Sequence, residues 1–303
     1  MIRLGTRGSA LALAQAREVV ELLQDDVELV KIITTGDRLS ARGAHPTPPE
    51  GGDKVRFVKE IDEALLDGRI DLAVHSAKDV PGELTPGLAI VGVPERADPL
   101  DALCGAAALD DLPEGAVVGT ASIRRRAQLL ALRPGLRVQE LRGNVDTRLR
   151  RLAEGGYDAI VLARAGLQRL GRDGEGRPLP ELVPAPGQGC LALAARDDDA
   201  ASRDVARAIS DGEALTALTA ERALVGRLDA SCHTPIGAFA ERAGDQLHLT
   251  AFVGLPDGSH WIRDELSGPL GDPAELGEAV AGRLEAAGAR ELLAEAERVA
   301  AAT

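Results

Sequence analysis

The chain has 303 residues, 45 % of them hydrophobic, and a net charge of −13 at neutral pH. This composition is typical of folded globular proteins and excludes a disordered chain, and the length suits two or three domains of roughly 100–200 residues each. Aromatic residues make up only 2 %. Because single-stranded nucleic acids are usually held by aromatic stacking and positive charge, the composition argues against a nucleic-acid partner.

No apolar run approaches the ~20 residues that a membrane-spanning helix needs. Residues 1–17 predict a strand followed by an Ala/Leu-rich helix and lack the pattern of a cleavable signal. We therefore expect a cytoplasmic protein with no membrane partner. The three cysteines, Cys104, Cys190 and Cys232, are odd in number and far apart, which predicts neither a disulfide framework nor a metal site.

Short β-rich runs alternate with helical patterns through the first two-thirds of the chain. The first set has strands at residues 2–6, 27–33, 71–74 and 88–93 and helices at 10–23 and 57–66. The second set, after residue 95, has strands at 117–120, 137–141 and 159–163 and helices at 122–132, 144–153 and shortly after 163. Strands separated by helices predict βαβ units and mostly parallel sheets.

The last third of the chain departs from this alternation. Residues 171–189 are rich in Gly and Pro and predict a connection, and residues 191–195 predict a buried strand that could return to the first domain. A long helix over 212–228 then precedes strands near 236–243, 246–254 and 260–266 and further helices. We predict an α/β protein of three domains: residues 1–94 with 190–210, residues 95–189, and an α+β domain of residues 211–303.

Residues 36–54 are polar, rich in Gly and Pro, and without periodicity. A loop of this length inside a compact domain is usually either a functional lid or a disordered insert. The pattern leaves both open, and we favour the lid.

Positive charge is concentrated in the second domain. Residues 124–177 contain 13 Arg against six acids, a local balance of +7, so the remaining residues sum to −20. Arginine pairs with carboxylate or phosphate through two parallel hydrogen bonds, and a basic region in an acidic protein indicates an anionic ligand. The alternative, that most of these arginines lie on solvated helix faces, stays open for single positions.

Four predicted strand-to-helix junctions share one composition, at residues 5–9, 75–79, 119–125 and 142–148. Each combines small polar residues with a basic residue at the carboxyl end of a strand, where helix N-termini favour anions and where ligands of open α/β sheets collect. Helix N-capping accounts for the Ser, Thr and Asn residues but not for a basic residue at every junction. Together the four junctions predict an anion-binding cleft.

Two single residues stand out as candidates for chemistry. Asp79 follows Lys78 and a buried run, and a carboxylate among cations could stabilise a developing positive charge, although an ion pair with Lys78 or a turn before Pro81 would explain it as well. Cys232 lies in a small-residue loop beside His233, where a thiol can be nucleophilic.

The motifs together resemble the porphobilinogen deaminase family. They are TRGSALALAQA (6–16), FVKEIDEALL (57–66), DLAVHSAKDVP (71–81), GTASIRRRAQL (119–129), LRGNVDTRL (141–149), YDAIVLARAGLQRLG (157–171), PAPGQG (184–189) and SCHTPIG (231–237). They occur in the order found in the family and cover nearly the whole chain. The resemblance implies two lobes similar to type II periplasmic-binding proteins, an active site in the cleft between them, and a C-terminal domain.

The resemblance also implies an activity. Such an enzyme is a transferase that condenses four porphobilinogen molecules head to tail with loss of ammonia, and then releases hydroxymethylbilane by hydrolysis, as part of porphyrin and heme biosynthesis. The growing chain is built on a dipyrromethane cofactor joined by a thioether to a cysteine, which matches Cys232. We expect a monomer, with porphobilinogen as its small-molecule substrate.

By the same resemblance Asp79 is the catalytic carboxylate, which holds the pyrrole N–H groups and stabilises the cation left when ammonia departs. The positions that match cofactor-binding residues are Cys232, Lys78, Ser76, Thr120, Ser122, Arg124, Arg125, Asn144 and Arg148. The positions that match substrate-binding residues are Arg7, Ser9, Gln15, Phe57, Arg142, Arg169, Gln188 and Lys54. No metal is expected.

The lid departs from the family pattern, because one extra residue separates the Gly pair from Lys54 and an earlier lysine is missing. A second hypothesis is a non-catalytic, two-lobed binding protein for a small polycarboxylate. Such a protein would use the arginines but would need neither Asp79 in the cleft nor Cys232 facing it, and it would normally carry an export signal.

Overall fold

The computed structural model describes residues 1–35, 55–230 and 234–301. The chain forms two compact units, one made of residues 1–97 and 190–215, the other of residues 98–189 and 216–303. No helix in the described ranges has both the length and the apolar character needed to cross a membrane. The predicted lid, residues 36–54, lies outside these ranges.

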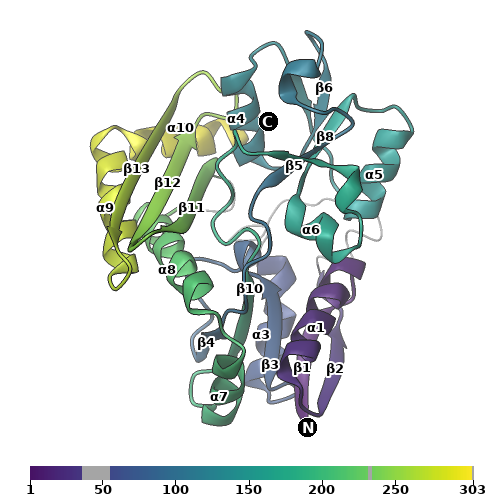
Figure 1. Ribbon diagram of the computed structural model, residues 1–303, viewed down its shortest axis with the longest axis vertical. Coiled ribbons are helices and arrows are strands. Elements are labelled where there is room, and N and C mark those ends of the chain that lie inside the picture. Colours follow the sequence, from purple (N-terminus) through teal and green to yellow (C-terminus); the bar gives the residue numbers. More distant parts are fainter. Residues whose placement is uncertain (36–54, 231–233, 302–303) are drawn as a thin grey trace. The chain divides into compact units, whose positions relative to one another are not determined.

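The first unit is built on a five-stranded mixed sheet (Figure 1). Its strand order is β2 (Val27–Ile32), β1 (Ile2–Arg7), β3 (Leu72–Ser76), β10 (Leu191–Arg196) and β4 (Leu88–Gly92). β1 pairs in parallel with β2 and β3, whereas β10 is antiparallel to β3 and β4. The strand predicted at 191–195 therefore does return to the first sheet.

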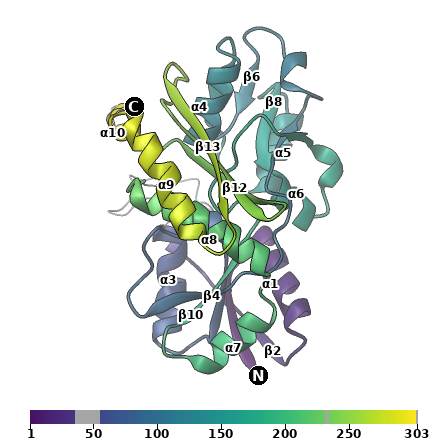
Figure 2. The ribbon, with the colours of Figure 1, turned by 60° about the vertical axis from the view of Figure 1, so that its left-hand side comes forward.

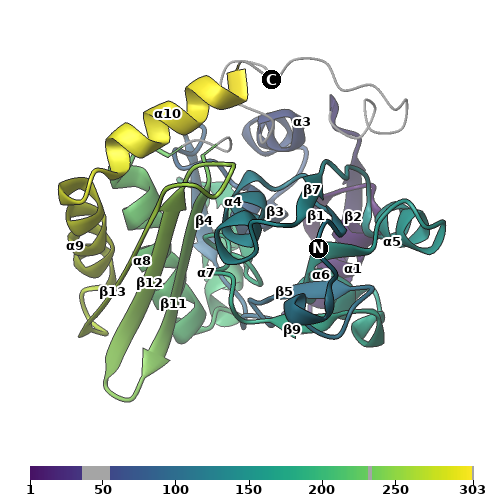
Figure 3. The ribbon, with the colours of Figure 1, turned by 90° about the horizontal axis from the view of Figure 1, so that it is seen from above.

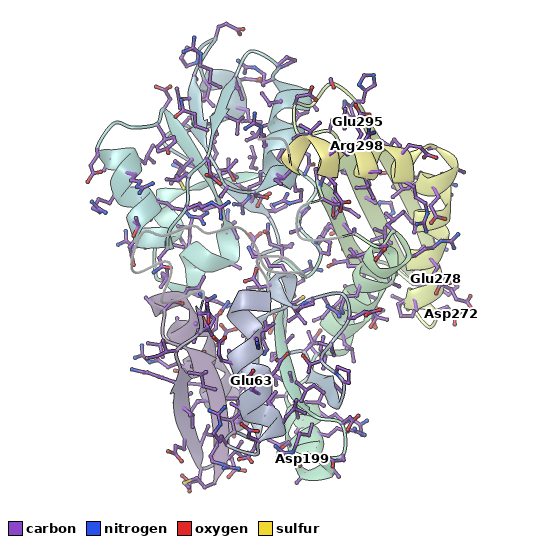
Figure 4. The ribbon with its side chains drawn as sticks, turned by 180° about the vertical axis from the view of Figure 1, so that it is seen from behind. Glu63, Asp199, Asp272, Glu278, Glu295 and Arg298 are labelled. Atoms are coloured by element: carbon purple, nitrogen blue, oxygen red, sulfur yellow. The ribbon has the colours of Figure 1, made fainter. Side chains whose placement is uncertain are left out.

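Helices cover both faces of this sheet, as the alternation of side chains along β3 requires. Leu72 and Val74 pack in one cluster with α1 (Ala10–Leu23) and α7 (Ala200–Ala208), and Ala73 packs in another with α3 (Val55–Leu66). Figure 4 shows the outer sides of α3 and α7, with Glu63 on α3 and with Asp199 before α7. The Asp199 side chain caps α7 by accepting the Ser202 N–H at 3.0 Å.

The second unit contains a sheet of the same size. Its order is β7 (Arg137–Gln139), β6 (Val117–Gly119), β8 (Ala159–Ala163), β5 (Asp101–Cys104) and β9 (Arg177–Leu179). One face packs on α4 (Ile123–Leu132) through Leu129, and the other on α5 (Val145–Ala153) and α6 (Arg164–Arg169) through Leu149 and Leu167. Gly119 is required on β6, because a Cβ there would lie 2.8 Å from the Tyr157 ring.

The two five-stranded sheets have the same arrangement of strand directions. In each, the second strand is parallel to the first and third, and the fourth is antiparallel to both of its neighbours. In each sheet the other four strands are consecutive in the chain, and the fourth strand is not. The first sheet combines β1–β4 with β10, and the second combines β6–β9 with β5. Four of the five strands in each sheet therefore run in one direction, which confirms the prediction of mostly parallel sheets, and the reversed strand is the one that no βαβ crossover joins to its neighbours.

The C-terminal part of the second unit is an antiparallel sheet of β11 (Ile236–Ala243), β12 (Gln246–Gly254) and β13 (Trp261–Pro269). Its strands and three helices, α8 (Gly212–Arg227), α9 (Pro273–Ala286) and α10 (Ala289–Ala301), form one apolar core. Figures 2 and 3 show α9 and α10 on one side of this sheet. Glu278, Glu295 and Arg298 lie on the outer sides of these helices (Figure 4).

The fold class predicted from the sequence, α/β with two lobes and a C-terminal α+β region, is confirmed. Most predicted helices begin within two residues of their observed starts, because each start combines apolar periodicity with a capping residue. Helix α7 was not predicted. The connection predicted at 171–189 contains a 3₁₀ turn at Asp173–Glu175 and the edge strand β9, and β13 continues to Pro269.

Candidate active site

In the first unit, the turn between β1 and α1 is fixed by two hydroxyl groups. Ser9 is the N-cap of α1 and accepts the Ala12 N–H at 3.3 Å. Thr6, fully buried, donates to the Ala12 carbonyl at 3.1 Å. Arg7, half-buried, is the last residue of β1. This turn therefore presents a guanidinium and the N-terminus of a 14-residue helix at the carboxyl edge of the sheet.

The end of β3 lies at the same edge, because β1 and β3 are parallel. Ser76 ends β3 and accepts a hydrogen bond of 2.7 Å from Gln15 Nε2 on α1. A 3₁₀ turn of Ala77–Asp79 follows, in which Lys78 and Asp79 are both half-buried. The structure thus brings together five of the predicted positions: Arg7, Gln15, Ser76, Lys78 and Asp79.

His75 lies within the electrostatic reach of this group. Burial lowers the pKa of His75 from 6.5 to about 4, the Asp79 carboxylate opposes this shift, and the Arg7 guanidinium adds to it. Near neutral pH the imidazole is therefore uncharged. It adds no positive charge beside Asp79.

In the second unit, the turn between β6 and α4 is organised in a similar way. Ser122 is the N-cap of α4 and accepts the Arg125 N–H at 3.4 Å. Thr120 is buried, and its hydroxyl accepts the Ser122 N–H at 3.2 Å. Both hydroxyl residues therefore lie where the sequence predicted them, at the start of an arginine-rich helix.

The two arginines of α4 that were predicted as cofactor ligands converge on Asp101, at the start of β5. Arg124 Nη1 lies 2.8 Å from Asp101 Oδ2, and Arg125 Nη2 lies 2.8 Å from Asp101 Oδ1. All three side chains are buried. Burial alone would raise the pKa of Asp101, but the two guanidinium charges outweigh it and hold this pKa far below its ordinary value. Asp101 is therefore ionised at any physiological pH.

Asp101 does not stand out in the local sequence. Its one signal is an acid directly before the apolar run Ala102 to Cys104, since buried charges are rare unless they are paired. Its partners are 23, 24 and 87 positions further along the chain. No local pattern connects residues that far apart.

Two other predicted residues lie against the 184–189 segment. Gln188 is 1 % exposed, and its Nε2 donates to Asp101 Oδ1 and to the Pro99 carbonyl, each at 2.8 Å. Arg169, the last residue of α6, donates to the Gly189 carbonyl at 3.1 Å. These contacts hold the connection against the second sheet.

The fourth junction lies at the start of α5 and is more open. Asn144 is the N-cap residue but makes no capping hydrogen bond with its side chain. Arg148 Nε donates to the Gly143 carbonyl at 2.7 Å, and Arg142 is paired with Glu140 at 2.6 Å. Arg142 and Asn144 are exposed, so this junction presents polar groups and positive charge to solvent.

Three predicted site residues cannot be placed. Lys54 and Cys232 lie outside the described residues, and so does the side chain of Phe57, whose backbone belongs to α3. Cys104 and Cys190 are buried free thiols, and burial raises the pKa of Cys104 to about 11. Within residues 1–35, 55–230 and 234–301 there is no cluster of three metal-ligating side chains.

The chemistry of these side chains suits a ligand that carries several carboxylates. The junctions combine guanidiniums, hydroxyls and helix N-termini, and the buried Arg124 Nε has no hydrogen-bond partner in the described part of the chain. A buried N–H is rarely left unpaired in a native protein, so an external acceptor fits this position. The fold and the site together define an α/β protein with two five-stranded sheets, whose strand ends carry guanidinium and hydroxyl groups suited to a polycarboxylate and, at one of them, the carboxylate of Asp79.

The comparisons with known proteins identify the family. The model described as porphobilinogen deaminase, dipyromethane cofactor binding domain, matches residues 2–204, and that of the porphobilinogen deaminase C-terminal domain matches residues 215–286. A porphobilinogen deaminase of Brevibacillus brevis is 43 % identical, with 98 % of this chain and 97 % of the relative covered. The chain belongs to the porphobilinogen deaminase family.

This membership confirms the predicted activity and cofactor. The protein is a transferase of porphyrin biosynthesis that acts on porphobilinogen and uses a dipyrromethane cofactor. It also decides against the alternative of a non-catalytic binding protein, because the matched domain is one that binds this cofactor.

Solved structures of binding proteins show only a low similarity to this chain. The methionine-binding protein MetQ is 17 % identical with a TM-score of 0.41, and 67 % of this chain and 87 % of that one are covered. A periplasmic substrate-binding protein of an ABC transporter from Coxiella burnetii is 16 % identical with a TM-score of 0.42, and 71 % and 94 % are covered. Similarity at this level carries no functional argument.

Proposed function

We propose that Asp79 is the catalytic carboxylate of this transferase. The observation that carries the proposal is the position of Asp79, half-buried in a 3₁₀ turn directly after β3, beside Lys78 and within the electrostatic reach of Arg7 and His75. A carboxylate held there accepts hydrogen bonds from pyrrole N–H groups. It also stabilises the positive charge that develops on the substrate pyrrole as the bond to the departing ammonia breaks.

The surroundings of Asp79 suit this role. His75 is neutral above a pH of about 4. It therefore supplies no positive charge that would neutralise the Asp79 carboxylate. The 3₁₀ turn is anchored at its start by the Ala77 N–H, which donates to the Cys190 carbonyl at 3.0 Å. The carboxylate is thus held on a rigid strand end, as positioning at a reaction centre requires.

We assign the remaining predicted residues to holding the cofactor and the growing chain. When bound, the dipyrromethane supplies the pyrrole carbon to which the next ring is joined, and Cys232 holds it as a thioether. Its acetate and propionate groups would pair with basic and hydroxyl side chains: Lys78, Ser76, Thr120, Ser122, Arg124, Arg125, Asn144 and Arg148. Incoming substrate and the extended chain would be held by Arg7, Ser9, Gln15, Phe57, Arg142, Arg169, Gln188 and Lys54.

Asp79→Asn tests the catalytic assignment. Removal of one preorganised charge from a reaction centre lowers kcat by about 10²–10³-fold, and we expect a loss of that size with unchanged dipyrromethane content by intact mass. The matched control is Asp67→Asn, an exposed acid of the same unit, which should leave kcat unchanged. A kcat of Asp79→Asn within threefold of the parent enzyme would remove the assignment.

We also propose that the enzyme is a cytoplasmic monomer of three domains with the boundaries predicted from the sequence, and that porphobilinogen is its partner rather than nucleic acid or membrane. Light scattering coupled to size-exclusion chromatography tests the first point. A mass near 31.6 kDa is expected, and a stable dimer would contradict it.

A further inference from the structure

The two buried arginines of α4 share an unusual geometry. Arg124 and Arg125 are consecutive residues in the first turn of the helix, and side chains at consecutive helical positions do not face each other. Both nevertheless reach the same carboxylate. Arg124 donates through Nη1 and Nη2 at 2.8 and 3.1 Å, and Arg125 through Nε and Nη2 at 3.0 and 2.8 Å. Asp101 therefore determines where both guanidiniums lie.

This arrangement is unfavourable for the helix taken alone. Cations in the first turn oppose the helix dipole, which prefers acids there, and α4 has no acid in its first turn. Two guanidiniums and one carboxylate leave the buried cluster with a net charge of +1. Among the residues that the structure describes, neither arginine is ion-paired with a second acid. Cations at a helix N-terminus and an uncompensated buried charge both lower stability, and features that do so without local benefit are characteristic of functional sites.

Each guanidinium also donates a hydrogen bond to a backbone carbonyl, which holds it in place. Arg124 Nη1 also donates to the Val183 carbonyl at 2.6 Å, and Arg125 Nη1 donates to the Val161 carbonyl of β8 at 2.8 Å. Arg124 Nε has no partner in the described ranges although it is buried. The cluster thus combines fixed cations, an excess positive charge and an N–H group that lacks an acceptor.

Asp101 also connects this cluster to the segment that leads back to the first unit. Gln188 Nε2 donates to Asp101 Oδ1 and to the Pro99 carbonyl, each at 2.8 Å. The Asp101 carboxylate on β5 therefore joins α4, through Arg124 and Arg125, to Gln188 of the connecting segment.

We propose that Asp101 is a positioning residue: its carboxylate fixes the guanidiniums of Arg124 and Arg125 so that they can receive the carboxylates of the dipyrromethane. This inference rests on the proposed function, in which those two arginines hold the cofactor. Asp101 touches neither cofactor nor substrate and acts through the arginines.

The test measures cofactor loading in folded protein. Purified protein is incubated with porphobilinogen, and the fraction of chains that gains two pyrrole units is followed by intact mass over time, beside circular dichroism and thermal unfolding. Asp101→Asn removes the charge with little change in shape, and Asp101→Glu keeps the charge but moves it by one methylene. We expect loading to slow at least tenfold in Asp101→Asn, with partial recovery in Asp101→Glu.

The matched control is Asp71→Asn. Asp71 accepts hydrogen bonds from Nε and Nη2 of Arg3 at 3.0 and 2.6 Å. It lies beside the start of β1, whereas the candidate site residues lie at the carboxyl end of that strand. This variant should unfold at a lower temperature and load at the parent rate. If Asp101→Asn does not fold, Asp101→Glu carries the test, since it retains the buried charge.

Two outcomes separate the inference from the proposed function. If Arg124→Lys slows loading while folded Asp101→Glu and Asp101→Asn load at the parent rate, Asp101 is only a packing residue and the inference is wrong. If Arg124→Lys itself loads at the parent rate, the assignment of that arginine to the cofactor fails, and the role of Asp101 falls with it.

Discussion

Helices α1 and α4 follow β1 and β6, the second strands in the order of their five-stranded sheets, and they differ in what they bury. Each starts at a serine N-cap, Ser9 and Ser122, and each has a buried glutamine six positions after its cap, Gln15 and Gln128. In α1 the glutamine reaches Ser76, beside the Asp79 turn. In α4 the glutamine binds the backbone of Val183, and two buried arginines lie in the first turn.

The same contrast appears in the antiparallel strand of each sheet. β10 is apolar from Leu191 to Ala195, and its Ala192 pairs with His75 of β3. β5 begins with Asp101, which neutralises half of the positive charge of the two buried arginines on α4. One topology thus serves two purposes. The first unit places half-buried charged and polar groups at a strand end, and the second holds cations inside its core.

The largest effect on stability should come from the buried arginines. Arg125→Leu removes a guanidinium from Asp101 and leaves the Val161 carbonyl without its donor, and breaking a buried ion pair destabilises a protein by about 3–5 kcal/mol. Urea unfolding of the apo-protein measures this. Arg126→Leu, on the next and exposed position of α4, is the control and should change stability by no more than about 0.5 kcal/mol. Equal effects of the two would contradict the core role of Arg125.

The next effect concerns the first unit and its dependence on pH. His75 has its pKa lowered from 6.5 to about 4 in the folded protein, so between these values the unfolded chain binds a proton that the native protein does not. Stability should therefore fall as the pH drops from 6.5 to 4, by about 3 kcal/mol from this group. Unfolding midpoints measured at several pH values should depend less on pH between 6.5 and 4 in His75→Gln than in the parent enzyme. A slope unchanged by that substitution would show that His75 does not cause it.

The two glutamines allow helices α1 and α4 to be compared through the same change, Gln to Leu, at equivalent positions. Gln128→Leu leaves the buried N–H of Val183 without its side-chain acceptor, while the Val183 carbonyl keeps the hydrogen bond from Arg124 Nη1. A buried group that loses its partner costs about 1–3 kcal/mol. Gln15→Leu removes one hydrogen bond, to the half-buried Ser76, and should cost about 1 kcal/mol. Chemical denaturation measures the free energy of unfolding of both variants. A larger loss in Gln15→Leu than in Gln128→Leu would contradict the comparison.

How much of this could be predicted from the sequence depends on the distance over which each feature is encoded. The starts of α1, α4 and α5 were predicted because caps and apolar periodicity lie within a few residues of each other. The position of β10 between β3 and β4 was left open, and that of β5 between β8 and β9 was not predicted, because a strand's neighbours are set by packing between distant segments.

The candidate site shows the same limit. Asp79 and the four basic junctions stood out from local composition and from the family motifs. Asp101 did not, because its importance comes from partners that only the fold brings together, and in the sequence it is one acid before a short apolar run. Features of that kind are found by asking of each buried charge what neutralises it.

The most direct test of the account is the intact mass of the purified protein, with peptide mapping around Cys232, before and after addition of porphobilinogen. The account predicts a mass excess of two pyrrole units on the peptide that contains Cys232, and stepwise growth by single units once substrate is added. A chain that stays unmodified and does not extend under reducing conditions would contradict it.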